Sequence, residues 1–175
     1  PYAQASVKDI LAKTMAAPYF PVEFGMLGAE ITSEGVCDKT FEIGAMRIET
    51  MQLSHPNRGL GYRFTEDGKS FVFLTDNELA LRHTGGAEYD DYLRFADGAD
   101  LLIHDAEYTE EQYKMTKGWG HSLYTDALRL ALESNAKQFG LFHLNQDRSD
   151  ADQDRIVDDC RRIVKEKNSS LACYA

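Results

Sequence analysis

The sequence predicts a layered α/β domain, and its order of elements is the main reason. Strand-like segments fill the first half, whereas short apolar runs alternate with amphipathic helical segments in the second half. With 175 residues, of which 43% are hydrophobic, the chain is long and apolar enough for one domain with a real core. We therefore expect a single domain over residues 1–175.

The first half of the chain is predicted to be mostly strands. It opens with a short helix, because Ser6 and Asp9 have the spacing of a capping box and Pro18 ends the helical pattern. Apolar or alternating segments then predict strands near residues 27–32, 41–53 (as one or two strands), 59–65 and 69–75. The last two flank Glu66-Asp67-Gly68, which is typical of a hairpin turn.

The second half alternates between helices and strands. The predicted helices cover residues 89–96, 110–115 and 123–133, and a last one begins at Ser149. The predicted strands cover residues 100–103, 138–142 and 171–174. Ser122 is placed to cap the third of these helices.

Composition and charge narrow the possible partners and the setting. The 19 basic residues against 29 acidic ones give a net charge of −10, so a long nucleic acid is not expected as a partner. The three cysteines have no C-x-x-C spacing, and their odd number favours a reducing, cytoplasmic setting over a disulfide framework. The sequence contains no apolar run of the roughly 20 residues that a membrane span needs, so we expect no membrane partner.

Four positions with ionisable side chains come directly after apolar, strand-like runs. They are His55, Asp76, the pair His104-Asp105, and His143. A single histidine at a strand end is most often a hydrogen-bonded loop residue, and Asp76 alone could simply form an Asx turn. Four such positions together favour a site at the carboxyl edge of the sheet, and their nitrogen and oxygen donors suit zinc, iron or manganese.

The loop at residues 118–122 places a fifth ionisable group near that edge. Two glycines allow a tight turn and hold His121 at the mouth of the loop, a position that suits proton transfer better than core packing. Asp105, at a neighbouring strand end, could orient the imidazole of His121 and hold it protonated. By contrast, His83 is interpreted as a surface residue and Trp119 as a packing residue.

Taken in order, these residues resemble the metallo-β-lactamase-fold hydrolases, in particular the branch of ribonuclease Z and its phosphodiesterase-like relatives. The resemblance rests on five segments: Leu53-Ser54-His55-Pro56, Phe73-Leu74-Thr75-Asp76, residues 99–108 (ADLLIHDAEY), Gly120-His121-Ser122 and Leu141-Phe142-His143. It implies an αβ/βα sandwich that lacks its N-terminal strands. The H-x-H-x-D-H signature of the family is absent from the sequence, so the chain resembles the C-terminal portion of a longer protein.

The resemblance also implies roles for the residues that match. His55 would bind one divalent metal ion and His143 the other, while Asp76 would bridge the two. His121 would donate a proton to the leaving oxygen, with Asp105 holding its ring. The expected metal is zinc, with manganese or iron as alternatives.

The function that follows from these roles is a binuclear metal-dependent hydrolase, a phosphodiesterase acting on a small phosphodiester or nucleotide. The alternative is a non-catalytic or partner-dependent module of the same fold. The absence of the H-x-H-x-D-H signature favours this alternative, whereas the three retained ligands His55, Asp76 and His143 argue against it. A redox enzyme with a di-iron site is a third, weaker interpretation. Missing first strands would leave an exposed sheet edge, so we expect a homodimer or association with the missing N-terminal portion.

Overall fold

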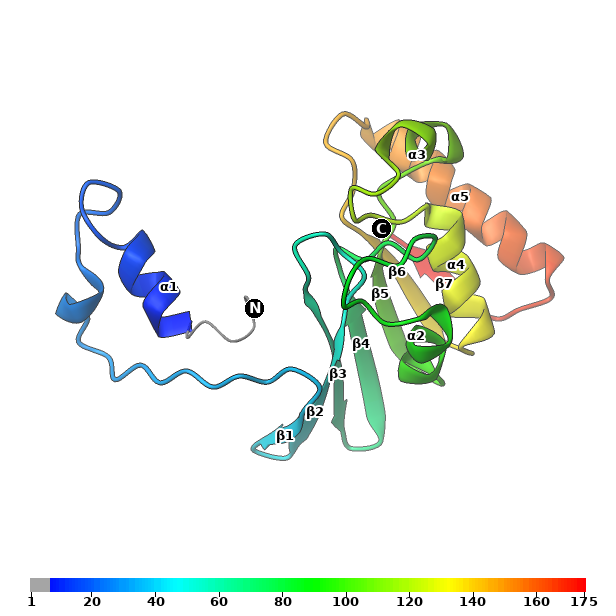
Figure 1. Ribbon diagram of the computed structural model, residues 1–175. Coiled ribbons are helices and arrows are strands. Elements are labelled where there is room, and N and C mark those ends of the chain that lie inside the picture. The colour runs from blue at the N-terminus through cyan, green and yellow to red at the C-terminus, as the bar shows by residue number, and fades with distance from the viewer. Residues whose placement is uncertain (1–6) are drawn as a thin grey trace. The chain divides into compact units, whose positions relative to one another are not determined.

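The computed structural model describes residues 7–175, and the chain divides into two compact units, residues 1–37 and residues 38–175 (Figure 1). The described part of the first unit holds helix α1 (Val7–Thr14) and a short 3-10 helix, η1 (Phe24–Met26). The predicted first helix is confirmed from residue 7 onward and ends before Pro18, while its predicted cap, Ser6, lies outside the described residues. The single-domain expectation stays a prediction.

The predicted strand near residues 27–32 is wrong. Residues 27–32 are irregular and largely exposed. A strand needs a neighbour for its backbone N–H and C=O groups, and the described residues of the first unit contain no other strand that could pair with this segment. The apolar residues of this segment therefore predicted a strand that does not form, because it has no strand to pair with.

Residues 38–175 form one seven-stranded mixed sheet. The strands lie side by side in their sequence order, from β1 at one edge to β7 at the other. Their bounds are β1 Thr40–Ile43, β2 Met46–Gln52, β3 Leu60–Glu66, β4 Lys69–Leu74, β5 Leu101–Asp105, β6 Gln138–Phe142 and β7 Ala172–Tyr174. Neighbouring strands are antiparallel from β1 to β4 and parallel from β4 to β7. The predicted α/β class is confirmed.

The hairpin between β3 and β4 forms as its turn chemistry predicts. Asp67 and Gly68 both adopt positive φ angles, 48° and 70°, and Glu66 pairs with Lys69 across the turn. Two successive left-handed residues match the right-handed twist of the flanking strands, which explains the preference for Asp-Gly at this place. The turn sets the register that later brings Asp76 to the edge of the sheet.

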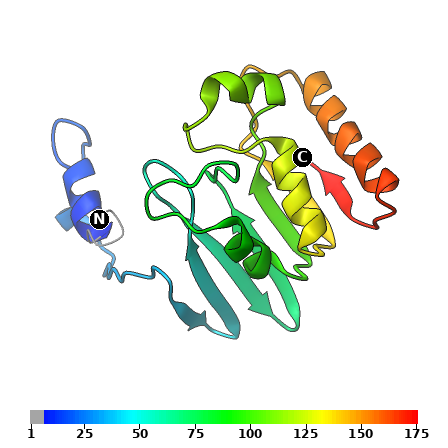
Figure 2. The ribbon, with the colours of Figure 1, turned by 45° about the vertical axis from the view of Figure 1, so that its right-hand side comes forward.

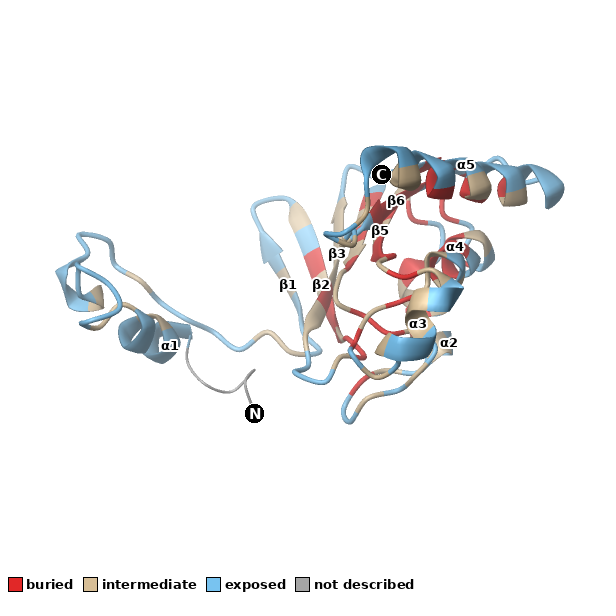
Figure 3. Ribbon diagram, turned by 90° about the horizontal axis from the view of Figure 1, so that it is seen from above, coloured by how far each residue is buried: buried red, intermediate tan, exposed pale blue. Residues whose placement is uncertain are grey.

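Four helices accompany the parallel part of the sheet. They are α2 (Tyr89–Ala96), α3 (Glu110–Thr116), α4 (Tyr124–Glu133) and α5 (Asp150–Glu166), close to the predicted ranges. Figure 2 shows α2 and α4 in front of the sheet, and in Figure 3 the buried residues of α4 and α5 face the strands. Ser149 caps α5 as expected, because its hydroxyl accepts a hydrogen bond from the Asp152 amide. Among the described residues, the helices are all too short or too polar to cross a membrane.

The hydrophobic core lies between these helices and one face of the sheet. Alternate strand residues point into it, as the period of two requires. Its fully buried members come from the central strands and from α2, α4 and α5, and include Val72, Leu74, Tyr92, Ala96, Leu102, Leu128, Leu130, Phe139 and Cys160. This packing makes the central strands a rigid base for the loops at their ends.

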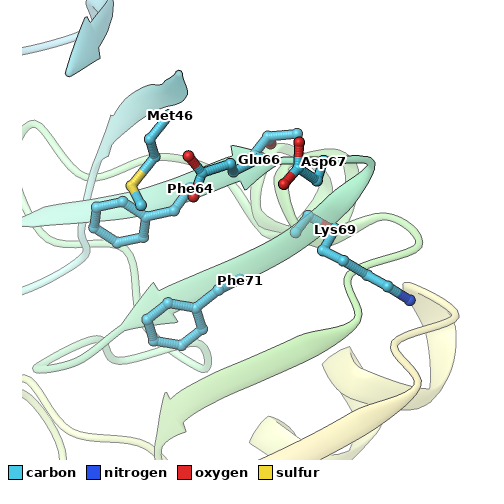
Figure 4. A pocket seen from close by; sticks show the side chains of 8 residues that line it. Met46, Phe64, Glu66, Asp67, Lys69 and Phe71 are labelled. Atoms are coloured by element: carbon cyan, nitrogen blue, oxygen red, sulfur yellow. The ribbon is translucent and has the colours of Figure 1, made fainter. Parts of the chain in front are cut away.

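The opposite face of the sheet carries a row of partly exposed aromatic side chains. Tyr62, Phe64, Phe71, Phe73 and Phe142 follow one another with ring centroids 5.3 to 6.0 Å apart. At the hairpin end of this face lies a pocket of about 560 Å³, lined by Phe64, Phe71 and the turn residues (Figure 4). The pocket lies at the end of the sheet where β4 begins, opposite to the edge where β4 ends.

Candidate metal and proton-transfer site

The topology gathers the predicted strand-end residues at one edge of the sheet. Strands β2 and β4 are both antiparallel to β3 and therefore run in the same direction, and β5 and β6 are parallel to β4. The carboxyl ends of all four strands thus meet at one edge. His55, Asp76, Asp105 and His143 lie at the ends of β2, β4, β5 and β6 respectively.

His121 and Asp105 form a close pair at this edge. The Nδ1 atom of His121 lies 2.6 Å from an Asp105 carboxylate oxygen, and because a carboxylate only accepts, Nδ1 carries the proton. Burial opposes the charged form of His121, but the hydrogen bond and charge of Asp105, together with Glu107 and Asp76, outweigh it, so the pKa of His121 is raised. The geometry leaves Nε2 as the ring nitrogen available to another group.

Asp105 is a fully buried carboxylate whose two oxygens are occupied by this chain. One oxygen accepts from the amides of Glu107 and Ser122, both at 3.2 Å. The other accepts from the Asn77 amide at 3.3 Å as well as from His121. Such a carboxylate is held in one orientation and fixes the ring that it binds. Its partners mark Asp105 as an orienting group rather than a free metal ligand.

Asp76 and His143 share an unusual backbone conformation. Asp76 lies two residues after the end of β4 and His143 directly follows β6, and both have positive φ angles, 52° for Asp76 and 55° for His143. This region is sparsely populated by residues other than glycine, and its cost is tolerated mainly where function or packing requires it. The two side chains approach each other, with Asp76 Oδ1 3.9 Å from His143 Nδ1.

These residues offer a donor set that fits a divalent metal. One potential ligand atom from each of Asp76, Asp105, His121 and His143 lies within 4.8 Å of the others. Because Asp105 is occupied and His121 is bound to it through Nδ1, the donors of this group that are open to a metal are the Asp76 carboxylate and the His143 ring. Asp76 also accepts a hydrogen bond from the Thr75 hydroxyl at 2.7 Å, which orients it. Imidazole and carboxylate donors of this kind suit zinc, manganese and iron.

His55 lies at the border of this group. Its ring centroid is 5.5 Å from that of His121, and its Nδ1 accepts a hydrogen bond from the Asn57 amide at 3.2 Å. An accepting Nδ1 leaves the ring proton of the neutral form on Nε2, so binding a metal through Nε2 requires its loss. Burial lowers the pKa of His55, with Asp76 opposing the shift, which favours the neutral ring that a metal ligand needs. Its role as a ligand stays a prediction.

Three residues near the site have positions that differ from the predicted ones. Ser122 does not cap a helix, because α4 begins one residue later with Leu123 as its N-cap; its hydroxyl instead bonds to the Leu79 amide and the Asn77 carbonyl. His83 is not a surface residue, since its side chain is 14% exposed and lies 2.7 Å from Glu78. Trp119 does not pack in the core and is 64% exposed.

Other residues that organise the candidate site carry no signal in the sequence. Glu107 lies 3.7 Å from His121 Nδ1, and Asn145 donates to the Glu107 side chain. Glu78 is fully buried; burial raises its pKa, but hydrogen bonds from Tyr113, His83, Gly118 and Gly120 outweigh that effect, so its pKa is lowered. Glu78 follows Asp76 by two positions, but three of its four partners lie 35 to 42 residues away, so no local motif signals it.

His104 has a structural role, although it shares the strand end with Asp105. Strand alternation turns its side chain into the core, where it is fully buried between the Asn77 side chain and the backbone carbonyl of Asp105. Burial lowers the pKa of His104 and keeps it neutral. Only Asp105 of the predicted His104-Asp105 pair therefore faces the site.

Comparison with known proteins agrees with this arrangement. A family model described as a beta-lactamase superfamily domain matches residues 1–144, which is more than half of the chain. The chain belongs to the beta-lactamase superfamily. Solved structures related to this superfamily member include the metallo-beta-lactamase fold protein YhfI from Bacillus subtilis, which is 20% identical, covers 78% of this chain and 50% of its own, and has a TM-score of 0.56. The expected metallo-β-lactamase-type fold is thereby confirmed.

Other relatives of this superfamily member are ribonucleases Z. The protein of that name from Oceanobacillus iheyensis is 22% identical over 203 residues, which cover 93% of this chain and 65% of the relative. One from Bacillus cereus is 24% identical and covers 82% and 59%. The short form of human tRNase Z is 26% identical, with a TM-score of 0.51, and covers 61% and 38%. The chain thus spans roughly three fifths of the length of the curated relatives that it matches.

Proposed function

We propose that residues 38–175 supply the metal-bridging and proton-donating side of a metal-dependent phosphodiesterase site. One observation carries the proposal: His121, held by the buried Asp105, lies at the same sheet edge as Asp76 and His143. Folding alone does not require a buried carboxylate–histidine pair beside two further ligand-type residues in strained backbone. Membership of the beta-lactamase superfamily and the similarity to ribonucleases Z support a metal-dependent hydrolase.

The metal would be held by Asp76 and His143, with His55 as a further ligand. We propose two divalent ions, zinc first, with Asp76 between them, because two nearby cations need a negative group to separate them. When bound, such ions supply Lewis-acid activation of water and neutralise the charge of the phosphate. The hydroxyl of Thr75 holds the Asp76 carboxylate in orientation while it does so.

The proton donor would be His121. Its Nδ1–H is engaged by Asp105, so its Nε2–H can point to the leaving oxygen of a phosphodiester. An alkoxide leaving group benefits from such a positioned acid, which favours phosphoester chemistry. Glu107, 3.7 Å from Nδ1, adds a second negative charge that supports the protonated ring.

The substrate that we propose is a small phosphodiester or nucleotide. The net charge of −10 disfavours the long electrostatic contact that an RNA substrate makes. Both bis(p-nitrophenyl) phosphate and a precursor tRNA should therefore be offered to the metal-loaded chain. Much faster cleavage of the precursor tRNA would contradict the proposed substrate while leaving the site intact.

The test of the metal site is metal content. The chain is incubated with zinc or manganese and desalted, and metal per chain is measured by plasma mass spectrometry on material of checked intact mass. We expect bound metal, with lower content in Asp76→Asn and in His143→Ala. Asp90→Asn, the same change on the exposed face of α2, is the matched control and should keep the full content.

The test of the proton donor uses the rate. His121→Ala is expected to lower kcat about 10²- to 10⁴-fold while metal content stays near that of the unaltered chain. Asp105→Asn should act in the same direction, because it removes the group that orients the ring.

A chain that binds no metal would instead favour a partner-dependent module, for which the absence of the H-x-H-x-D-H signature is the specific observation. In that case the three strand-end ligands act only when another segment or chain completes the site.

A further inference from the structure

Glu78 is a buried carboxylate that the proposed reaction does not use, and four donors converge on it. Oε1 accepts from the Tyr113 hydroxyl at 2.6 Å and from the Gly118 amide at 2.8 Å. Oε2 accepts from the Gly120 amide at 2.9 Å and from the His83 ring at 2.7 Å. Glu78 is 1% exposed, and both of its oxygens are fully engaged.

Three of these donors lie 35 to 42 residues from Glu78 in the sequence, and the fourth, His83, lies five residues away. Tyr113 belongs to α3, His83 to the loop after β4, and the two glycines to the loop that leads into His121. Burying a carboxylate is costly unless it is hydrogen-bonded, and here a single side chain accepts bonds from its own loop and from α3 with the loop that follows it. The structure therefore concentrates this cost at the one place where the His121 loop meets its neighbours.

The two glycine amides define the path of the loop just before His121. Gly118 and Gly120 have φ angles of 92° and 105°, which only glycine adopts readily. Without an acceptor for its two N–H groups, such a loop would have several backbone arrangements available to it. Glu78 accepts from both amides and so selects one arrangement, which sets where His121 begins.

The backbone of Glu78 is anchored as well. Its amide donates to the Ser54 carbonyl at 2.8 Å, one residue before His55. Ser54 in turn binds the Leu81 carbonyl and the His83 amide through its hydroxyl. Glu78 thus connects the strand end that carries His55 with the loop that carries His121.

We propose that Glu78 is the positioning residue of the His121 loop: its carboxylate fixes the backbone at Gly118 and Gly120 and thereby holds His121 against Asp105. The functional part of this inference rests on the role proposed for His121. The geometric part concerns the folded chain alone and is tested without metal or substrate.

The chain carries a reporter at the right place. Trp119 is the single tryptophan, lies between the two glycines and is exposed, so its fluorescence anisotropy follows the order of this loop. A second reporter is the ring Nδ1–H signal of His121 in histidine-labelled NMR spectra, because this proton lies in the 2.6 Å hydrogen bond to Asp105. Neither signal depends on overall stability as long as the chain stays folded.

The decisive variant is Glu78→Gln. It keeps the size of the side chain but replaces one acceptor oxygen by an NH₂ group, so two of the four donors then face a donor. We expect the anisotropy of Trp119 to fall and the His121 ring signal to shift or broaden. The matched control is Glu133→Gln, which makes the same change where Glu133 accepts from the Tyr89 hydroxyl on the surface; both signals should stay as in the unaltered chain.

Amide hydrogen exchange of the unaltered chain keeps the inference testable if Glu78→Gln does not fold. The Gly118 and Gly120 amides should exchange far more slowly than free peptide amides, although they lie in a loop. Fast exchange at both would overturn the inference, as would unchanged Trp119 and His121 signals in folded Glu78→Gln. A third outcome is that folded Glu78→Gln changes both signals while the unaltered chain binds no metal. That result would uphold the positioning role and count only against the proposed function.

Discussion

Gly120 is the position where a single added methyl group should disturb the site most. A Cβ atom at Gly120 would lie 2.1 Å from His55 Cδ2 and 2.7 Å from Pro56 Cδ. Carbon atoms in contact are ordinarily about 3.5 to 4.0 Å apart. The His55 ring can turn away, but the Pro56 ring is joined to the backbone and cannot. We therefore expect Gly120→Ala to displace His55 and to strain the loop.

Gly118→Ala provides the control from which the magnitude follows. Gly118 also has a left-handed backbone, but the nearest atom to its added Cβ would be Leu81 Cδ2 at 3.8 Å, an ordinary contact. Its substitution should cost about 1–3 kcal/mol of folding free energy for the backbone alone. Gly120→Ala pays a similar backbone cost plus about 1–3 kcal/mol for overpacking. The expected difference between the two variants is therefore about 1–3 kcal/mol.

Urea unfolding followed by circular dichroism gives both free energies. The double variant His55→Ala/Gly120→Ala should recover part of the loss, because it removes the ring but not the contact with Pro56. Equal losses in Gly118→Ala and Gly120→Ala would refute the reasoning, since they would mean that the loop avoids His55 at no cost. Full recovery in the double variant would show that Pro56 does not constrain the loop.

Three further predictions concern the stability of the sheet. Lys137 and other donors lower the pKa of Asp100 below its ordinary value of 3.8. The ionised carboxylate therefore stabilises the fold above that pH, and this stabilisation is lost as the pH falls toward the lowered pKa. Asp100→Asn should be less stable than the unaltered chain at pH 6, and the difference in stability should disappear in acid-unfolding curves. Tyr92→Phe removes a buried hydroxyl that donates to a main-chain carbonyl and should cost about 1–3 kcal/mol in urea unfolding. Leu102→Ala, on the helix-covered face, should cost about 2–5 kcal/mol, whereas Ile103→Ala on the partly exposed face should cost less. Equal costs that grow with protein concentration would indicate that a second copy covers that face.

The class of the fold and several residues of the candidate site can be predicted from the sequence alone. Period-two and helical patterns located the strands and helices of residues 38–175, because each element has one buried side that local spacing reveals. The positions of Asp76, Asp105 and His143 at strand ends follow from the same patterns, because each lies where an apolar run stops. His121 can also be proposed from the sequence, because the two glycines before it predict a tight loop without any knowledge of contacts.

The side chains that hold the candidate site in place can be identified only from the tertiary structure. Glu78 and His83 bind each other within the loop after β4, and two further donors to Glu78, Tyr113 and Gly120, lie more than thirty residues away from it. Serine is a common helix-capping residue, yet the Ser122 hydroxyl donates a hydrogen bond to the Asn77 carbonyl instead. Such bonds join segments that the packing of the sheet and helices brings together, and the spacing of residues along the sequence does not predict them. The spacing of apolar and turn residues thus predicts where the chain turns and which side of each element is buried. The partner of a buried polar group is specified only by the complete fold.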